Sequence, residues 1–277
     1  PIVAVVSKCV QNPQVDQLCE HIERAIGLKP IITSAKNGSG IDQLRAAIAS
    51  LVKSEERLIT EGFCEAGDLV MLVMPQDAQA PKGRLIKPQV QTLRELLDRG
   101  CMAVSCTAEQ MPEALAALAA PPKLIITDSQ VFDRVFALKP EGSVLTSFSI
   151  LFARYKGDIE AFVKGAAAIE RLTPSSRVLI AEACAHAPQN EDIGRVKLPR
   201  MLRGKVGEQL SIDVVAGDDF PKDLTQYDLV IHCGACMFNR RHVMSRVAQA
   251  SAQGVAITNY GVAIAALKGI LSRVKTA

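Results

Sequence analysis

The sequence predicts an α/β protein with a mostly parallel sheet in its C-terminal domain. Short apolar segments rich in β-branched residues alternate with longer segments in which apolar residues recur at helical spacing. This alternation is typical of parallel sheets covered by helices. Hydrophobic residues make up 48% and charged residues 22% of the 277 residues, so the chain can bury a core. Its length allows one large domain or several small ones.

The first predicted domain covers residues 1–52 and has the order strand, helix, strand, helix. We expect strands at 2–6 and 30–33 and helices at 15–26 and 41–51. Residues 53–66 are charged and irregular, so we interpret them as a linker. Because the chain begins with Pro1 rather than Met, we expect it to be part of a longer protein.

The second predicted domain covers residues 67–120. We expect strands at 68–74 and 102–106 and helices at 88–98 and 112–119. Two strands do not form a stable sheet on their own. We therefore expect this domain to pair edge to edge with a second copy and to form a homodimer. Pro121-Pro122 marks its end.

The third predicted domain covers residues 121–277 and carries most of the strands. We expect strands at 124–127, 144–145, 178–181, 228–231 and 256–258, with helices such as 157–172 and 241–253 between them. The sequence pattern indicates no internal repeat. This domain is predicted to hold the mostly parallel sheet.

Composition argues against several functional classes. The net charge is +3, and the 32 basic residues are scattered rather than gathered into a stripe, so nucleic-acid binding is not indicated. No apolar stretch is long enough to cross a membrane. The chain shows no export signal, so its eight cysteines do not indicate a disulfide framework. We expect a cytoplasmic and anoxic setting, in which clustered thiols are more often metal ligands.

Cysteine and histidine residues follow two of the predicted strands. Strand 178–181 leads into Cys184 and His186, and strand 228–231 leads into His232, Cys233 and Cys236. Because ligands of open parallel sheets bind beyond the carboxyl ends of the strands, we expect these residues to converge at one edge of the sheet. The C-x-x-C spacing lets two thiolates reach one metal centre.

Three thiolates leave one coordination position for another group. Gly234, inside the C-x-x-C segment, is expected to relieve crowding in the turn. His186 and His232 are candidates for the fourth ligand or for hydrogen bonds to the metal centre. Spacing alone supports a zinc-stabilised Cys3His interaction module and an iron–sulfur site about equally. An iron–sulfur electron carrier is a further alternative.

The sequence around these cysteines resembles the HydF family of FeFe-hydrogenase maturation proteins. The resemblance rests on the spacing from Cys184 and His186 to His232, Cys233 and Cys236, and it covers the chain from Gly67 onward. Further matching segments are APKGRLIKPQVQ (80–91), ITDSQVF (126–132), TSFSILFARYKGD (146–158), DIGRVKLPR (192–200) and TNYG (258–261).

The resemblance implies a scaffold for assembly of the hydrogenase H-cluster. It implies a 4Fe-4S cluster on Cys184, Cys233 and Cys236 with an open iron site that accepts a di-iron precursor. The implied partners are the radical-SAM maturases HydE and HydG, which supply the precursor, and apo-hydrogenase HydA, which receives it. It also implies that residues 67–120 are a dimerisation domain and that 121–277 bind the cluster.

Residues 1–52 resemble the C-terminal part of a Ras-like GTPase domain. Ser34-Ala35-Lys36 matches a guanine-contacting motif of that family, whereas Ser7 and Val10 stand where its N-K-x-D motif belongs. Val10 cannot accept hydrogen bonds from guanine, and the chain contains no G-x-x-x-x-G-K-[ST] phosphate-binding loop. We therefore expect this chain not to hydrolyse GTP alone, and we expect GTP and Mg²⁺ binding, if any, only in the intact protein.

Overall fold

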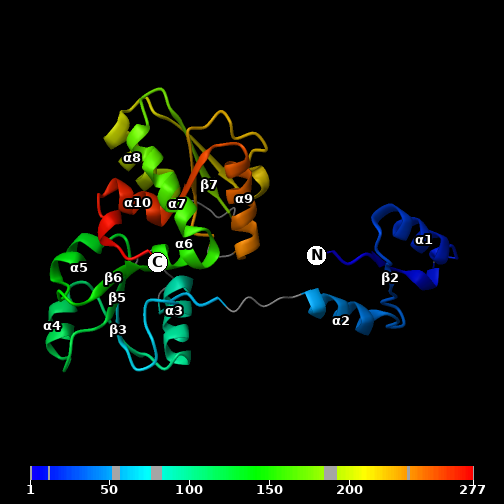
Figure 1. The fold of residues 1–277 in the computed structure, drawn as a ribbon, viewed down its shortest axis with the longest axis horizontal. Helices are drawn as coiled ribbons and strands as arrows, with labels where there is room; N and C mark the ends of the chain where they lie inside the picture. The colour runs from blue at the N-terminus through cyan, green and yellow to red at the C-terminus, as the bar shows by residue number, and fades with distance from the viewer. Residues whose placement is uncertain are drawn as a thin grey trace. The chain divides into compact units, whose positions relative to one another are not determined.

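A computed structural model describes residues 2–11, 13–51, 57–75, 83–183, 192–235 and 238–276. The chain forms two compact units, Pro1–Glu56 and Arg57–Ala277. Figure 1 draws both units, and each is described here by itself. Within the described residues, no helix is long and apolar enough to span a membrane.

The first unit has the predicted order of elements. Strands β1 (Val5–Val6) and β2 (Ile31–Ile32) pair in parallel, and helices α1 (Val15–Ile26) and α2 (Ile41–Leu51) follow them. Both helices begin and end where the sequence predicts. Gly27 caps α1 with a left-handed backbone at φ 69°, which a residue without a Cβ adopts at little cost.

The second unit begins with a sheet of four parallel strands in the order β4-β3-β5-β6. Its strands are β3 (Leu69–Val73), β4 (Met102–Cys106), β5 (Leu124–Thr127) and β6 (Val144–Ser147). Its helices are α3 (Lys87–Asp98), α4 (Met111–Ala116), α5 (Phe132–Leu138) and α6 (Phe148–Lys156).

This sheet contradicts the predicted domain boundary at Pro121-Pro122. Strand β5 lies beyond that dipeptide, yet it pairs with β3 through the register Val70 to Leu124. The sheet therefore gains two strands from the same chain, and the need for a second copy to complete it disappears. The prediction failed because a Pro-Pro pair marks a loop, whereas strand pairing depends on tertiary contacts that the local pattern does not contain.

A second sheet of four parallel strands follows, in the order β10-β9-β7-β8. Its strands are β7 (Arg177–Glu182), β8 (Ser211–Ala216), β9 (Leu229–His232) and β10 (Ala256–Asn259). Its helices are α7 (Ile159–Ala166), α8 (Leu198–Val206), α9 (Arg240–Ala252) and α10 (Tyr260–Leu267). The sequence did not predict β8, which is a half-exposed edge strand and so lacks the continuous apolar run of its buried neighbours.

The two sheets repeat one topology. In each, the first strand in sequence pairs with the second on one side and with the third on the other, and the fourth flanks the third. The register makes Asp128 after β5 the equivalent of Cys233 after β9, because Leu124 and Leu229 occupy matching positions. By the same count, Ser149 in α6 corresponds to Gly261 in α10.

The register also reveals matching sequence, which corrects the expectation of no internal repeat. The matching pairs are QDAQAP (76–81) with ACAHAP (183–188), GRLIKPQ (83–89) with GRVKLPR (194–200), and TSFSILFA (146–153) with TNYGVAIA (258–265). The segments are short and their identities scattered; the last pair follows directly from the strand register, and the first two lie in the connections after β3 and β7. We call residues 69–156 and 177–268 the first and second repeats.

Helices α6 and α10 lie between the two sheets and pack against each other (Figure 1). A Cβ at Gly261 would approach the side chain of Ser149 to 2.5 Å, so the equivalent positions of the two repeats touch. Apolar residues of both sheets belong to one continuous core. The contact is therefore reciprocal, and it places the carboxyl ends of the strands of both repeats near the seam.

Candidate metal centre

Cys233 lies at the point where the strand order of the second sheet reverses. It follows β9, which pairs with β7, and its backbone N–H donates to the carbonyl oxygen of Ala181 in β7 at 2.9 Å. In open parallel sheets such switch points are the usual ligand sites, because the chain leaves the two adjacent strands in opposite directions. The end of β7 and the start of the Cys233 loop thus lie side by side, and the convergence of the cysteines and histidines themselves stays a prediction.

The Cys233 thiol accepts backbone hydrogen bonds from both loops. Ala183 N–H approaches Sγ at 3.1 Å, and Ala235 N–H approaches it at 3.4 Å. Donors aimed at sulfur favour its anionic form, because they stabilise the thiolate. Ala183 is the residue that directly precedes Cys184 in the sequence.

The remaining predicted ligands lie outside the described residues. These are Cys184, His186 and Cys236. Among the residues that the structure does describe, no group of three or more His, Cys, Asp or Glu side chains could hold a metal ion. The three-cysteine site remains a prediction.

The turn after Cys233 does not depend on Gly234 as the sequence suggested. No described atom lies within 4 Å of a Cβ built at Gly234. The left-handed residue is instead Ala235, with φ 47°. An alanine in this region costs about 1–2 kcal/mol, and such strain is commonly stored at functional sites.

His232 supports the Cys233 loop from inside the sheet. It is fully buried, its Nδ1 lies 2.7 Å from the carbonyl oxygen of Cys233, and its Nε2 lies 3.1 Å from Arg246 Nη1. Because arginine can only donate, Nε2 accepts and Nδ1–H donates. Burial lowers the pKa of His232 to about 4, and the nearby Arg246 charge acts in the same direction. Both ring nitrogens thus have protein partners, and His232 acts as a positioning residue in this structure.

Two buried cations lie around the loop. Arg246, only 5% exposed, donates to the carbonyl oxygen of Gly217 at 2.5 Å, and burial lowers its pKa while the nearby Cys233 sulfur acts in the opposite direction. Lys156, 8% exposed, donates to the carbonyl oxygens of Ala235 at 2.8 Å and Phe238 at 3.0 Å. Buried positive charge on both sides favours an anionic group at this loop.

Carboxylates near the site are already engaged within the protein. Glu182, at the end of β7, is 2% exposed and accepts from Arg195 at 2.9 and 3.2 Å. This pairing raises the pKa of Arg195. Asp192 accepts from the backbone N–H groups of Gly194 and Arg195 at 2.8 and 2.9 Å and so caps the helical turn that follows it.

Tyr260 brings a buried hydroxyl toward the centre. It starts α10, and its hydroxyl is buried with no hydrogen-bond partner among the described residues. Burial raises its pKa strongly, and the negative charges of Cys233 and Glu182 add to that effect. Gly194 allows this placement, because a Cβ there would lie 2.0 Å from the hydroxyl oxygen. Among the described residues this buried donor has no acceptor, so its partner lies outside that part of the chain or is a bound group.

The predicted guanine-contacting residues lie in the loop after β2. Ser34 is buried, Lys36 is exposed, and Ser34 N–H donates to the carbonyl oxygen of Ser39 at 3.0 Å. The loop after β1 lies beside it, since Cys9 N–H donates to the carbonyl oxygen of Thr33 at 3.3 Å. The structure therefore brings the two motif positions together, and nucleotide binding stays a prediction.

Sequence reasoning missed three residues of this centre. Arg246 and Lys156 are ordinary helix residues in the sequence, and only the fold turns them toward the Cys233 loop. Tyr260 lies in the segment TNYG, which directly follows a predicted strand. Its position at a strand end was the signal that could have included it.

Two family models match most of this chain. Residues 59–157 match the hydrogen maturase F dimerization domain, and residues 160–276 match the hydrogen maturase F tetramerization domain. The two matched regions contain the first and the second repeat respectively. No curated protein matches the chain.

Similarity to solved structures is weak. An NtrC family transcriptional regulator from Clostridium acetobutylicum has 9% identity and a TM-score of 0.24, covering 75% of this chain and 96% of its own. A 5,10-methylenetetrahydrofolate dehydrogenase from the silkworm Bombyx mori has 11% identity and a TM-score of 0.22, covering 83% and 92%. Scores this low do not indicate a shared fold.

Proposed function

The chain belongs to the hydrogen maturase F family and so has a role in hydrogenase maturation, and from this premise we propose that it is the scaffold that carries an iron–sulfur cluster during that process. The cluster is a 4Fe-4S cluster held by Cys184, Cys233 and Cys236. The observation that carries the proposal is the pair of backbone N–H groups, one from each loop, on the Cys233 thiol.

The described residues fit such a cluster. The next residue after Ala183 is Cys184, and peptide geometry keeps neighbouring Cα atoms about 3.8 Å apart. A donor to Cys233 Sγ therefore stands directly beside a second thiol in the chain. The buried cations Lys156 and Arg246 match the negative charge of a thiolate-ligated cluster. The Tyr260 hydroxyl, which has no partner among the described residues, supplies a donor for a cluster sulfur or its thiolate ligand.

When bound, the cluster supplies one iron position without a cysteine ligand, to which the di-iron precursor of the H-cluster attaches as cargo. The protein's own residues position and shield this site. His232 fixes the carbonyl of Cys233, Lys156 fixes the carbonyls that follow it, and Tyr260 covers one side. In this proposal HydE and HydG supply the precursor and HydA receives it.

Both matched domains are named for self-association, so the protein forms oligomers through them. The homodimer that we propose uses the first repeat. The sheet of that repeat is complete within one chain, so its dimer contact is not required to finish the sheet. The assignment of the homodimer contact to the first repeat is part of the proposal. Light scattering of the full chain tests whether the homodimer forms.

Anaerobic reconstitution with iron and sulfide tests the cluster assignment. We expect about four irons and four sulfides per chain and an absorbance band near roughly 400 nm, as is usual for thiolate-ligated clusters. The variant Cys184→Ser should lose most of this band and of the bound iron. Cys64→Ser is the matched control, because Cys64 is buried in the separate core of the first sheet.

The same measurement decides between the alternatives. One zinc per chain with no sulfide in anaerobically purified protein would refute the cluster and support a zinc-stabilised module. An unchanged band in Cys184→Ser would refute the ligand set. If cyanide or another small ligand leaves the EPR spectrum of the reduced protein unchanged, the cluster has no open iron position. That result would favour an electron carrier.

A further inference from the structure

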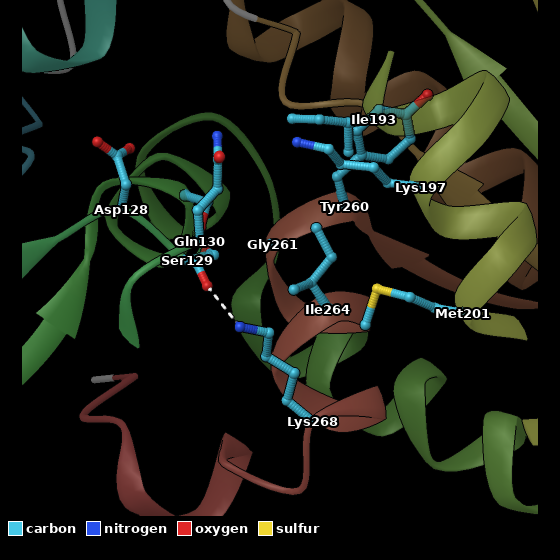
Figure 2. Close-up of a pocket in the computed structure, with 11 residues that line it drawn as sticks. Asp128, Ser129, Gln130, Ile193, Lys197, Met201, Tyr260, Gly261, Ile264 and Lys268 are labelled. Atoms are coloured by element: carbon cyan, nitrogen blue, oxygen red, sulfur yellow. Dashed lines mark hydrogen bonds between the residues drawn. The ribbon is translucent and has the colours of Figure 1, made fainter. Parts of the chain in front are cut away.

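The structure contains a second possible ligand site, at the seam between the repeats and outside the Cys233 loop. A cavity of about 350 Å³ lies at the carboxyl end of β5. Figure 2 shows Asp128, Ser129 and Gln130 on one side of it and residues of α8 and α10 on the other. Ligand pockets in proteins span roughly 300–1,000 Å³, so this volume suits a small molecule.

The place of this cavity in the fold follows from the internal repeat. The loop after β5 holds the position in the first sheet that the Cys233 loop holds in the second. It too follows a strand at the point where the strand order reverses. Asp128 replaces the cysteine at the equivalent position, so this loop presents oxygen and nitrogen groups instead of sulfur.

The lysines of the two repeats hold these loops reciprocally. Lys156 of α6 reaches into the second repeat and donates to Phe238. Its equivalent, Lys268 at the end of α10, reaches into the first repeat and contacts the carbonyl oxygen of Ser129 at 3.2 Å and Asp133 Oδ2 at 3.3 Å. The contact between Lys268 and Ser129 is the dashed line in Figure 2. Equivalent lysines, each bound to a backbone carbonyl oxygen of the other repeat, therefore hold the proposed cluster loop and the wall of this cavity.

The charged groups at the cavity are two lysines and one aspartate, and Asp133 pairs with one of the lysines, Lys268. The lining of the cavity includes the ammonium groups of Lys197 and Lys268, and Asp128 is the single acidic residue among the described residues that line it. That carboxylate accepts from Gln89 Nε2 at 2.9 Å. Lys197 extends from its helical turn toward Gln130, across the cavity (Figure 2). The hydroxyl groups of Ser129 and Ser149 lie 2.7 Å apart and share one hydrogen bond, which leaves the proton of only one of them for another acceptor.

Apolar side chains share the wall with the lysines and face the loop after β5. Ile193, Met201 and Ile264 line this wall, and the ring of Tyr260 adjoins them. A small apolar wall facing a few convergent polar groups is the usual composition of a small-molecule site. The first turn of α10 also borders the cavity at Gly261, where the helix dipole favours negative charge.

We propose that this cavity binds a small organic anion, with its phosphate or carboxylate group at Lys197 and its apolar body against Ile193, Met201 and Ile264. Tyr260 lines the cavity, so the bound anion contacts a side chain that also belongs to the proposed metal centre. The inference stands on the cavity alone and does not require the cluster.

Calorimetric titration of the full chain with phenyl phosphate, benzoate and benzyl alcohol tests the proposal. We expect phenyl phosphate or benzoate to bind and benzyl alcohol not to, and the tighter of the two anions identifies the anionic group. Lys197→Gln should weaken anion binding about tenfold or more, because it removes a charged hydrogen-bond donor. Lys197→Arg should retain it. Added salt should weaken binding as well.

Lys164→Gln is the control, because Lys164 is an exposed lysine on α7 and does not line the cavity. Circular dichroism checks that each variant is folded. The proposal would be overturned if the unmodified chain did not bind either anion at concentrations up to roughly 10 mM. A dissociation constant above that concentration is weaker than a specific site provides. Equal affinity in Lys197→Gln, or equal affinity for benzyl alcohol, would overturn it too. Because the titration uses cluster-free protein, its failure leaves the cluster assignment standing.

Discussion

Replacing Lys156 by Met should destabilise the Cys233 loop without opening a large cavity. The ammonium group holds two carbonyl oxygens, of Ala235 at 2.8 Å and of Phe238 at 3.0 Å, and the residue is 8% exposed. Hydrogen bonds from charged groups contribute about 1.5–3 kcal/mol each. Removal of a buried charge offsets part of that loss. We expect the free energy of unfolding to fall by about 2–4 kcal/mol, a range set by the charged hydrogen bonds less the relieved desolvation.

Equilibrium urea unfolding of the cluster-free chain measures this change, and Lys268→Met is its matched control. Lys268 occupies the equivalent position in the other repeat, but its side chain is 25% exposed and its contacts are longer, at 3.2 and 3.3 Å. A partly exposed pair of this kind contributes about 0–1 kcal/mol. Reconstituted Lys156→Met should also lose iron faster than the parent chain, because the loop that follows Cys233 is less fixed. Equal destabilisation by the two variants would contradict this prediction. It would show that burial of the ammonium group does not determine how much its hydrogen bonds contribute to the free energy of unfolding.

Tyr260→Phe should stabilise the cluster-free chain by about 1 kcal/mol in thermal unfolding, since it removes a buried hydroxyl without a described partner. In reconstituted protein it should accelerate loss of the cluster. A loss of stability in the cluster-free chain would contradict this prediction, because it would indicate that the hydroxyl has a partner. Gly165→Ala should lower stability by about 2–4 kcal/mol, because its Cβ would lie 1.9 Å from the carbonyl oxygen of Ile257. Gly142→Ala, whose Cβ meets no described atom within 4 Å, should change it by less than about 0.5 kcal/mol and serves as control. Asp192→Ala should cost about 1 kcal/mol in urea unfolding by removing a cap; no change would mean that water replaces the carboxylate.

Local patterns predicted most of the elements and failed at the pairing between them. Helices Val15–Ile26 and Ile41–Leu51 and strand Met102–Cys106 have the predicted bounds, because apolar periodicity and turn residues act within a few positions of the chain. The membership of β5 in the first sheet depends on contacts across about fifty residues, which no local signal contains. The edge strand β8 escaped prediction because half of its surface is exposed.

The site was predictable where it depended on strand ends and not where it depended on helices. Cys233 lies beside the end of β7 as the sequence indicated, because parallel strands share their carboxyl edge. The residues that support it, Arg246 and Lys156, come from the interior and the end of helices, where an arginine or lysine normally indicates a solvated face. Lys156 is buried because it reaches into the other repeat, whereas Arg246 is buried by contacts within its own repeat, with His232 and Gly217.

The reciprocal seam has a consequence for how the two halves of this chain can change. When two separate identical subunits meet across such a contact, every substitution appears on both sides at once. Here the two sides belong to one polypeptide, so a thiol can stand after β9 while a carboxylate stands after β5. Covalent fusion thus frees each half to acquire its own chemistry, while the lysines that cross the seam continue to hold both in register.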